Sequence, residues 1–402
     1  MKRHRLAWLL AAGVASLMAV ACGGSDPDYV GDEPTPGFVP GEGIAPPRFA
    51  YAVHSNGDSV SGYTVDPTTG KLATMGSGTP WTTGSTPVCI AVDPLVRYAY
   101  VANSGSDNLS IFSIGDPSGV LTSAALPVAT GDQPMSVAVD PQGRYVYVAN
   151  LGDDTISAYS RSTVTGLLTP IAGSPFSLPS SADIAPRSIA IDPTGKFVYV
   201  ANYGATASPS TISMFSIDTS STGSLTPGAL TGVGSIAAGA RPNLITVSPS
   251  GRQVYVSNET GDSVMVYSIA NTLTGGLAYI GFVSTPGSTP TGVAIEPNNK
   301  FAYISNRSTG VIGAYSIGQG GSTIGQLSAI TGGSATITTP ASPGPTAVAA
   351  DPSGKFVYAS LLNGGGIAAY EINATTGALT MVEDSPFDDS GATQSDFILI
   401  TK

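Results

Sequence analysis

The chain has 402 residues with 50 glycines and 31 prolines, and only 11% of its residues are charged. Many turn-forming residues and little charge favour short strands joined by tight turns over long helices with solvated faces. The formal net charge of −11 argues against nucleic acid as a partner and disfavours a general anionic-membrane surface, because both need a basic protein surface.

The first 21 residues form a predicted export signal. The basic start MKRHR is followed by the apolar run LAWLLAAGVASLMAVA and then by Cys22. This arrangement is typical of a secretory signal and too short for a membrane span of the mature protein. The stretch AVAC resembles the lipobox of bacterial lipoproteins, so we expect lipid attachment at Cys22, with ordinary secretion as the alternative. Gly23 as the second mature residue favours anchoring in the outer membrane of the cell envelope, as the lipoprotein pattern implies.

Residues 22–46 follow as a predicted tether. Behind Cys22 this segment contains many glycines, prolines and acidic residues, and no lysine or arginine. Such a composition predicts a disordered acidic linker between an anchor and a folded domain.

From residue 47 onward, one pattern recurs about every fifty residues. Copies of DPQGRYVYVAN (140–150) recur along the chain, and each unit centres on one tyrosine. The central tyrosines are Tyr51, Tyr100, Tyr147, Tyr199, Tyr255, Tyr303 and Tyr358. Seven units of this length indicate a repeat architecture.

Each unit contains four short predicted strands. In the unit around Tyr199, SIAIDP leads through a turn into KFVYVAN, then TISMFSI, then TGSLTP. Both faces of the second strand are apolar, so each small sheet must be covered on both sides. This predicts an all-β, seven-bladed β-propeller of four-stranded antiparallel blades over residues 47–402. Asp93, Asp140, Asp192 and Asp351 are expected to form turns rather than act as catalytic acids.

The two ends of the repeat region predict how the ring closes. The first unit lacks an innermost strand, and the chain ends in the apolar segment SDFILITK. We expect this C-terminal strand to complete the first blade and protect its edge.

The quoted motifs resemble a known family. The Y-V-A-N cores, the D-P-x-G-[KR] turns and the Gly-x-Leu outer strands are similar to seven-bladed YVTN-type propellers. The stretches LLTPIAGSPF (167–176) and ALTMVEDSPF (378–387) further resemble the lactonase family, which includes 6-phosphogluconolactonases and carboxymuconate cyclases. The resemblance implies that histidine, arginine and acidic residues act at the mouth of the central channel.

Two arginines are placed to meet a ligand there. Arg187 and Arg241 lie in the loops that lead into the innermost strands of consecutive units, and Arg307 lies in the adjacent set of loops. Converging guanidinium groups could clamp a carboxylate or phosphate, which makes these three residues the candidate ligand-binding set. The alternative is that they are solvated loop residues paired with acids such as Asp183 or Glu259.

Lactone hydrolysis would also need a base for water and donors for the oxyanion. The candidates are His54 or Glu259 as base, with Arg187 and Arg241 as the clamp. His54 is the only histidine after the signal segment, and it occupies the position where other units end their second strand with asparagine. A structural role for His54 is therefore the alternative.

Two functions remain open at this stage. The preferred one is an envelope-anchored binding or scaffold module that holds any ligand at the channel mouth, because no histidine precedes the innermost strands. The alternative is a lactonase-like hydrolase or cyclase. Neither function implies a cofactor, and no cysteine or histidine spacing predicts a metal site. The expected partners are the membrane, through the lipid, and a small anionic ligand, polymer or protein.

Overall fold

The structure is a computed structural model that describes residues 48–402, except 77–78, 183, 205–209, 221–225, 286–288, 338–343, 363–365 and 389–394. The predicted export signal, Cys22 and the predicted tether therefore lie outside the described residues. Within the described residues, no helix has the length and apolar character needed to cross a membrane.

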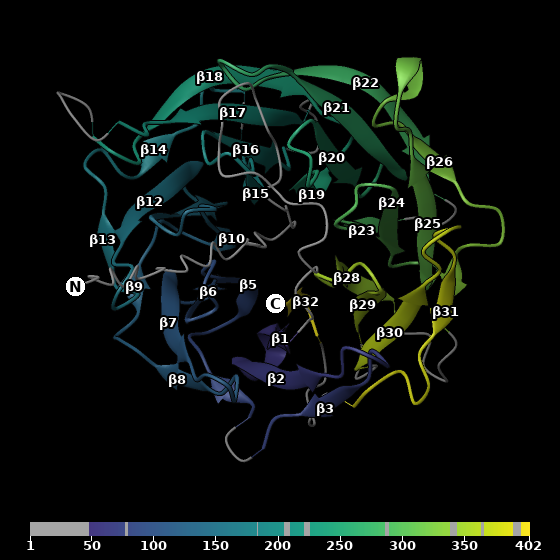
Figure 1. The fold of residues 1–402 in the computed structure, drawn as a ribbon. Coiled ribbons are helices and arrows are strands. Elements are labelled where there is room, and N and C mark those ends of the chain that lie inside the picture. Colours follow the sequence, from purple (N-terminus) through teal and green to yellow (C-terminus); the bar gives the residue numbers. More distant parts are fainter. Residues whose placement is uncertain are drawn as a thin grey trace, which may run out of the picture.

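Seven antiparallel sheets surround a central axis as the blades of a propeller (Figure 1). Counted outward from the axis, blade one contains β32 (Phe397–Ile400), β1 (Phe49–His54), β2 (Ser59–Val65) and β3 (Leu72–Thr74). The other blades, in chain order, are β5 (Pro87–Val92), β6 (Tyr98–Asn103), β7 (Asn108–Ile114) and β8 (Leu121–Ser123); β10 (Pro134–Val139), β11 (Tyr145–Asn150), β12 (Thr155–Arg161) and β13 (Leu168–Pro170); β15 (Pro186–Ile191), β16 (Phe197–Asn202), β17 (Thr211–Ile217) and β18 (Leu230–Ala237); β19 (Pro242–Val247), β20 (Gln253–Asn258), β21 (Ser263–Asn271) and β22 (Gly276–Ser284); β23 (Pro290–Ile295), β24 (Phe301–Asn306), β25 (Val311–Ile317) and β26 (Leu327–Ala329); and β28 (Pro345–Ala350), β29 (Phe356–Leu361), β30 (Ile367–Ile372) and β31 (Leu379–Met381). The predicted seven-bladed architecture is confirmed.

Short additional elements decorate this frame. Four blades carry an extra two-residue strand that pairs with the third strand: β4 (Trp81–Thr82), β9 (Val128–Ala129), β14 (Phe176–Ser177) and β27 (Ala335–Thr336). Two 3₁₀ turns, η1 (Ser55–Gly57) and η2 (Gly321–Thr323), lie in connections. The four-strand pattern read from the sequence missed the extra strands because each is only two residues long.

The C-terminal strand closes the ring as predicted. β32 pairs antiparallel with β1, with Ala50 opposite Ile400 and Val53 opposite Phe397. The two strands lie side by side near the axis in Figure 1, although they come from opposite ends of the described chain. The closure removes the unpaired inner edge that blade one would otherwise present.

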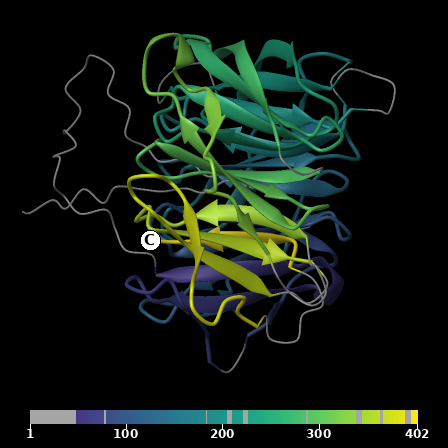
Figure 2. The same ribbon diagram turned by 90° about the vertical axis from the view of Figure 1, so that its right-hand side faces the viewer.

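The disc has two different ends. The turns between the first and second strands of each blade lie at one end, which we call the turn face. The innermost strands begin at the opposite end, which we call the mouth face. The C-terminus follows the innermost strand β32 and therefore lies at the turn face, on the left in Figure 2.

The predicted turn-forming aspartates are confirmed. Their carboxylates also accept hydrogen bonds from backbone N–H groups beyond the turn, at the start of the second strand. Asp192 Oδ1 accepts the backbone N–H of Lys196 at 2.8 Å and of Phe197 at 2.7 Å. Asp93, Asp140 and Asp351 make the equivalent pair of bonds. All four carboxylates are buried, so they stabilise the start of the second strand instead of facing a ligand.

The tyrosine at the centre of each repeat joins its blade to the next. Each hydroxyl donates a hydrogen bond to the carbonyl of a glycine in the following blade, at 2.6–3.0 Å. The last of these bonds, from Tyr358 to Gly70, runs from blade seven to blade one. All seven tyrosines are fully buried, so the repeated residue is the interblade connector as well as part of the core.

Candidate functional site

The second residue of the innermost strand is a β-bulge in six blades. In blade four, Pro186 pairs with Asn202 and Ser188 pairs with Ala201, which leaves Arg187 without a partner in the ladder. The other five blades with a leading proline show the same shift. Such a bulge redirects one side chain, and here it redirects that side chain at the channel mouth.

Seven residues share this position and form what we call the mouth ring. Blade one contributes Asp396, because it directly precedes Phe397, whose pairing with Val53 marks the start of β32. The mouth ring consists of Val88, Met135, Arg187, Asn243, Thr291, Thr346 and Asp396.

The mouth ring lines a cavity of about 170 Å³, to which Arg307 also contributes. This volume has room for on the order of ten water molecules and thus for a small organic ligand. Val88 and Met135 make one side of the wall apolar, while the remaining ring members are polar or charged. The cavity therefore combines apolar surface with a few convergent polar groups, as ligand sites do.

Arg187 is the central cation of this cavity. Its Nε donates a hydrogen bond to Asn243 Oδ1 at 2.6 Å, and its guanidinium lies 5.0 Å from the centre of the Tyr203 ring. Burial lowers the pKa of Arg187, and the group nevertheless stays charged at neutral pH because arginine titrates far above it. Among the described residues, Arg187 forms no ion pair within 4.0 Å, so its direct contacts are with a neutral amide and an aromatic face, while Glu259 acts on its charge from a greater distance.

Three consecutive blades place Tyr203, Glu259 and Arg307 at one equivalent position, directly after the second strand. The Tyr203 hydroxyl donates to Glu259 Oε2 at 2.6 Å, and Arg307 Nη2 donates to Glu259 Oε1 at 2.8 Å. Burial raises the pKa of Glu259, whereas the hydrogen bond from Tyr203 and the nearby arginines lower it. The lowering effects together are larger, so the net shift of the pKa is downward. Both carboxylate oxygens are occupied, so Glu259 is placed to orient its neighbours more than to accept a proton.

The structure brings part of the predicted site together. Arg187 and Arg307 line the cavity. Arg241 lies over the Tyr203 ring at 4.4 Å from its centre and is not among the residues of the cavity wall. Arg187 and Arg241 thus both pack against the ring of Tyr203, and Glu259 accepts a hydrogen bond from the hydroxyl of that residue.

His54 lies elsewhere, inside blade one. Its side chain is 1% exposed, and Nε2 lies 2.8 Å from Ser61 Oγ. In blade two, Asn103 makes the corresponding hydrogen bond to Ser110 Oγ at 2.9 Å. The placement matches the structural alternative, in which His54 substitutes for the asparagine of the other blades.

Three residues of the site were missed in the sequence: Asn243, Tyr203 and Asp396. A signal for two of them was present, because Asn243 and Asp396 occupy the same repeat position as Arg187. Reading one position across all seven units would have found the mouth ring. Tyr203 occupies the same repeat position as the candidates Glu259 and Arg307, directly after the second strand, so the same comparison across units would have pointed to it.

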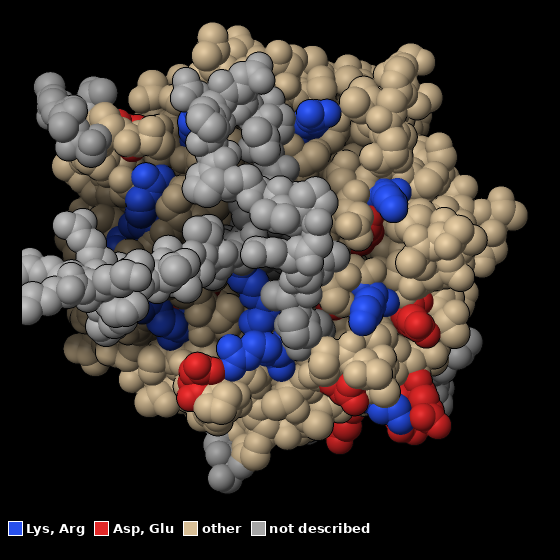
Figure 3. All heavy atoms as spheres, viewed as in Figure 1, with Lys and Arg blue, Asp and Glu red and all other residues tan. Residues whose placement is uncertain are grey.

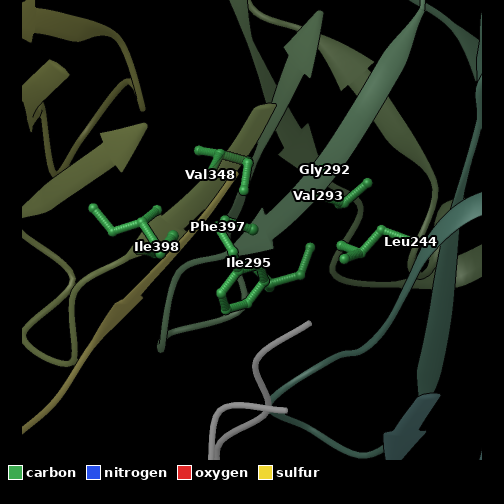
Figure 4. Close-up of a pocket in the computed structure, with 11 residues that line it drawn as sticks. Leu244, Gly292, Val293, Ile295, Val348, Phe397 and Ile398 are labelled. Atoms are coloured by element: carbon green, nitrogen blue, oxygen red, sulfur yellow. The ribbon is translucent and has the colours of Figure 1, made fainter. Parts of the chain in front are cut away.

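Further along the same innermost strands, the channel becomes apolar. A smaller cavity of about 40 Å³ is lined by residues such as Leu244, Val293, Ile295, Val348 and Phe397 (Figure 4). Of these two cavities, the one at the mouth is therefore the one with polar side chains in its wall. No group of three or more His, Cys, Asp or Glu side chains that could hold a metal occurs among the described residues.

Comparison with known proteins agrees with this architecture. A family model described as "Lactonase, 7-bladed beta-propeller" matches residues 47–184, 137–234 and 210–339. No curated protein matches the sequence at a significant level.

Solved structures share the fold at low sequence identity. A proposed 6-phosphogluconolactonase from Bacteroides fragilis superposes with a TM-score of 0.70 at 17% identity, covering 92% of this chain and 100% of its own. A proposed 6-phosphogluconolactonase from Bacteroides uniformis has a TM-score of 0.68 at 21% identity, covering 88% and 98%. A periplasmic gluconolactonase from Pseudomonas aeruginosa has a TM-score of 0.68 at 16% identity, covering 89% and 99%.

Proposed function

Because the chain belongs to the lactonase family of seven-bladed β-propellers, we propose that it hydrolyses a lactone at the mouth of its central channel. Family membership favours this reading over the binding or scaffold module preferred from the sequence. That preference rested on the absence of a histidine before the innermost strands, and the cavity contains other groups able to do the chemistry.

The observation that carries the proposal is that Arg187 forms no ion pair with the described residues; Asp183, one of the acids expected to pair with it, lies outside them. A partly buried guanidinium with no carboxylate of the described chain within 4.0 Å favours a ligand that is anionic or that becomes anionic during the reaction. In lactone hydrolysis, negative charge develops on the carbonyl oxygen and then remains on the product carboxylate. We assign the Nη groups of Arg187 and the amide nitrogen of Asn243 as the hydrogen-bond donors to that oxygen.

The reaction needs few further parts. Water attacks the carbonyl carbon, the bond from that carbon to the ring oxygen breaks, and the ring oxygen takes up a proton to give a hydroxy acid. Asp396 is the carboxylate of the cavity wall, and we assign it the role of accepting the proton from water. Glu259 holds Arg307 and Tyr203 in place, which keeps a second cation at the rim of the cavity.

Activity assays on the purified full chain test this function. A panel of γ- and δ-aldonolactones, with and without a phosphate or carboxylate, is followed by proton release in a pH-stat. Turnover is expected, and Arg187→Met should lower kcat/KM by roughly 100-fold, as removal of an oxyanion donor does. Lys300→Met, at the opposite end of the disc, is the matched loss of one charge and should leave turnover unchanged. If anions bind at the mouth but no lactone is consumed, the binding-module alternative holds instead.

We also propose that the protein is exported and held at the cell envelope by a lipid on Cys22. The motif around Cys22 supports this, and the Pseudomonas aeruginosa structure combines the same fold with a periplasmic location. Cell fractionation is the test: the protein should follow the membranes, and Cys22→Ala should release it. A Cys22→Ala protein that stays with the membranes would count against lipidation.

A further inference from the structure

The residue that follows each member of the mouth ring forms a second layer of the channel, and this layer has two unlike halves. In blades two to four, the sulfur or oxygen of its side chain accepts a backbone N–H of the next blade at 3.2–3.5 Å: Cys89, Ser136 and Ser188. In blades five, six, seven and one, the same position has an apolar side chain or none: Leu244, Gly292, Ala347 and Phe397. Polar contacts between blades therefore close one half of the layer, and the other half is apolar.

The cavity of about 40 Å³ lies against the apolar half. Its wall comes from the innermost strands of blades five, six, seven and one, and Figure 4 shows their side chains together. Three residues of this wall, Leu244, Ala347 and Phe397, also line the mouth cavity. The two cavities therefore adjoin, and the smaller one extends the site along the channel.

Packing along the innermost strands shows the same asymmetry. In the wall of the small cavity, Val348 and Ala349 are each 8% exposed. At the same strand positions in blade three, Val137 and Ala138 are fully buried. Because close packing is the rule in a protein interior, the remaining exposure marks apolar surface left open on one side of the channel.

The threonines of the mouth ring have no hydroxyl proton left for a ligand. Each hydroxyl donates to a backbone carbonyl of the following blade, at 3.0 Å for Thr291 and 2.6 Å for Thr346, and a hydroxyl has only one proton to donate. The side chains of Val88 and Met135 add only apolar surface to the same wall. Ring hydroxyls of a sugar lactone would lose water at this part of the wall without gaining donors in exchange.

From the two adjoining cavities we propose that the substrate is a lactone that carries an alkyl chain and few ring hydroxyls. This inference rests on the proposed lactone hydrolysis and names the substrate class of that same site. The lactone carbonyl lies at Arg187 and Asn243, and the alkyl chain passes Phe397 into the apolar cavity. At roughly 10–15 Å³ for each water-sized group, a cavity of about 40 Å³ takes a chain of about three carbons. Hydrolysis leaves this chain on the carbon that bears the new hydroxyl group.

The opposite end of the channel is a less suitable entrance for such a ligand. Basic and acidic side chains are both distributed around the turn face, which faces the viewer in Figure 3. Ion pairs such as Arg48 with Asp116 and Lys71 with Glu383 lie at that end. At the mouth, by contrast, Val88 gives the cavity an apolar side, so we assign entry to the mouth.

A series of γ-lactones tests the substrate class. The purified full chain is assayed in a pH-stat with γ-lactones that carry methyl, ethyl, propyl, butyl or hexyl groups, beside a γ-aldonolactone of the same ring size. We expect kcat/KM to rise about fourfold for each added methylene, up to about three carbons, and to stop rising beyond that. The γ-aldonolactone should be roughly tenfold worse for each ring hydroxyl that is left without a partner.

A pair of matched variants locates the chain. Val348→Ala removes two methyl groups from the wall of the small cavity and should move the optimum to a longer alkyl chain. Val137→Ala is the same substitution at the same strand position in blade three, outside both cavity walls, and should leave the optimum unchanged. The optimum is a comparison among substrates of one protein, so a general loss of stability does not move it. The wild-type series decides the question even where a variant fails to fold.

Three results would overturn the inference, and they separate it from the proposed function. Turnover of the aldonolactone with no dependence on alkyl length would refute the alkyl substrate and leave lactone hydrolysis standing. No turnover of any lactone would refute both. An equal shift of the optimum in Val348→Ala and Val137→Ala would show that the chain does not bind in the apolar cavity.

Discussion

Removing one interblade hydroxyl should measurably destabilise the ring. The Tyr147 hydroxyl donates to Gly228 O at 2.8 Å across the boundary between blades three and four, and the side chain of Tyr147 is fully buried. Tyr147→Phe keeps the aromatic packing and leaves a buried carbonyl without this donor. The expected cost is about 1–3 kcal/mol of the free energy of unfolding, the typical penalty for a buried polar group that loses its partner.

The chain contains a matched control for this change. Tyr315 is 1% exposed, burial raises the pKa of its hydroxyl to about 12, and the hydroxyl has no hydrogen-bond partner among the described residues. Tyr315→Phe removes the same atom from an equally buried ring, so we expect no loss of stability, or a small gain.

Denaturant unfolding of the purified full chain, followed by fluorescence and circular dichroism, compares the two variants. If Tyr315→Phe costs as much as Tyr147→Phe, the loss reflects packing around a phenol in general, and the interblade hydrogen bond does not explain it. Tyr358→Phe removes the hydroxyl that joins blade seven to blade one. Comparing its loss of unfolding free energy with that of Tyr147→Phe shows whether this junction is as stable as one between blades that are consecutive in sequence.

Three further predictions concern buried charge, backbone conformation and pH. Arg161→Met should cost about 3–5 kcal/mol in denaturant unfolding, because it leaves Asp93 buried and without its 2.7 Å partner, and Asp93→Asn in the same chain should restore much of that loss. Gly119→Ala should cost more in thermal unfolding than Gly332→Ala: both glycines have positive φ, but a Cβ at Gly119 would lie 2.5 Å from an aromatic ring of the neighbouring blade, whereas Gly332 has open space. The lowered pKa of Glu259 contributes stability that is present above the unfolded pKa of about 4.3 and is lost as pH falls through the folded pKa, so Glu259→Gln should flatten the acid side of the stability profile. Equal acid sensitivity in wild type and variant would contradict that last assignment.

The architecture could be read from the sequence because its causes are local. Alternation with period two, Asp-Pro-Gly turns and a repeated tyrosine each specify strands and connections within one unit, and both apolar faces of a strand require covering sheets. The partner of the C-terminal strand could also be predicted. The first unit lacks an innermost strand and the C-terminal segment belongs to no unit of its own, so the two were expected to pair, as β32 and β1 do.

The site could be read only in part. Arg187 and Arg307 were recognisable as cations in loops near the axis, but their relation to Tyr203, Glu259 and Asn243 was not. These five residues come from three blades and are as much as 120 positions apart (307 − 187), and a bulge decides which of them points inward.

The sequence by itself therefore determined the units and their number, since each unit's hydrogen bonds and turns are made by residues close together in the chain. Tertiary structure alone decided which side chains share the mouth, which hydroxyl reaches the next blade, and that the lysines and arginines lie mostly at the turn face while exposed acids lie at both ends. Net charge and composition are sums over the chain, and such sums contain no information about direction. Direction is created only when the blades close into a disc and give the molecule two distinct ends.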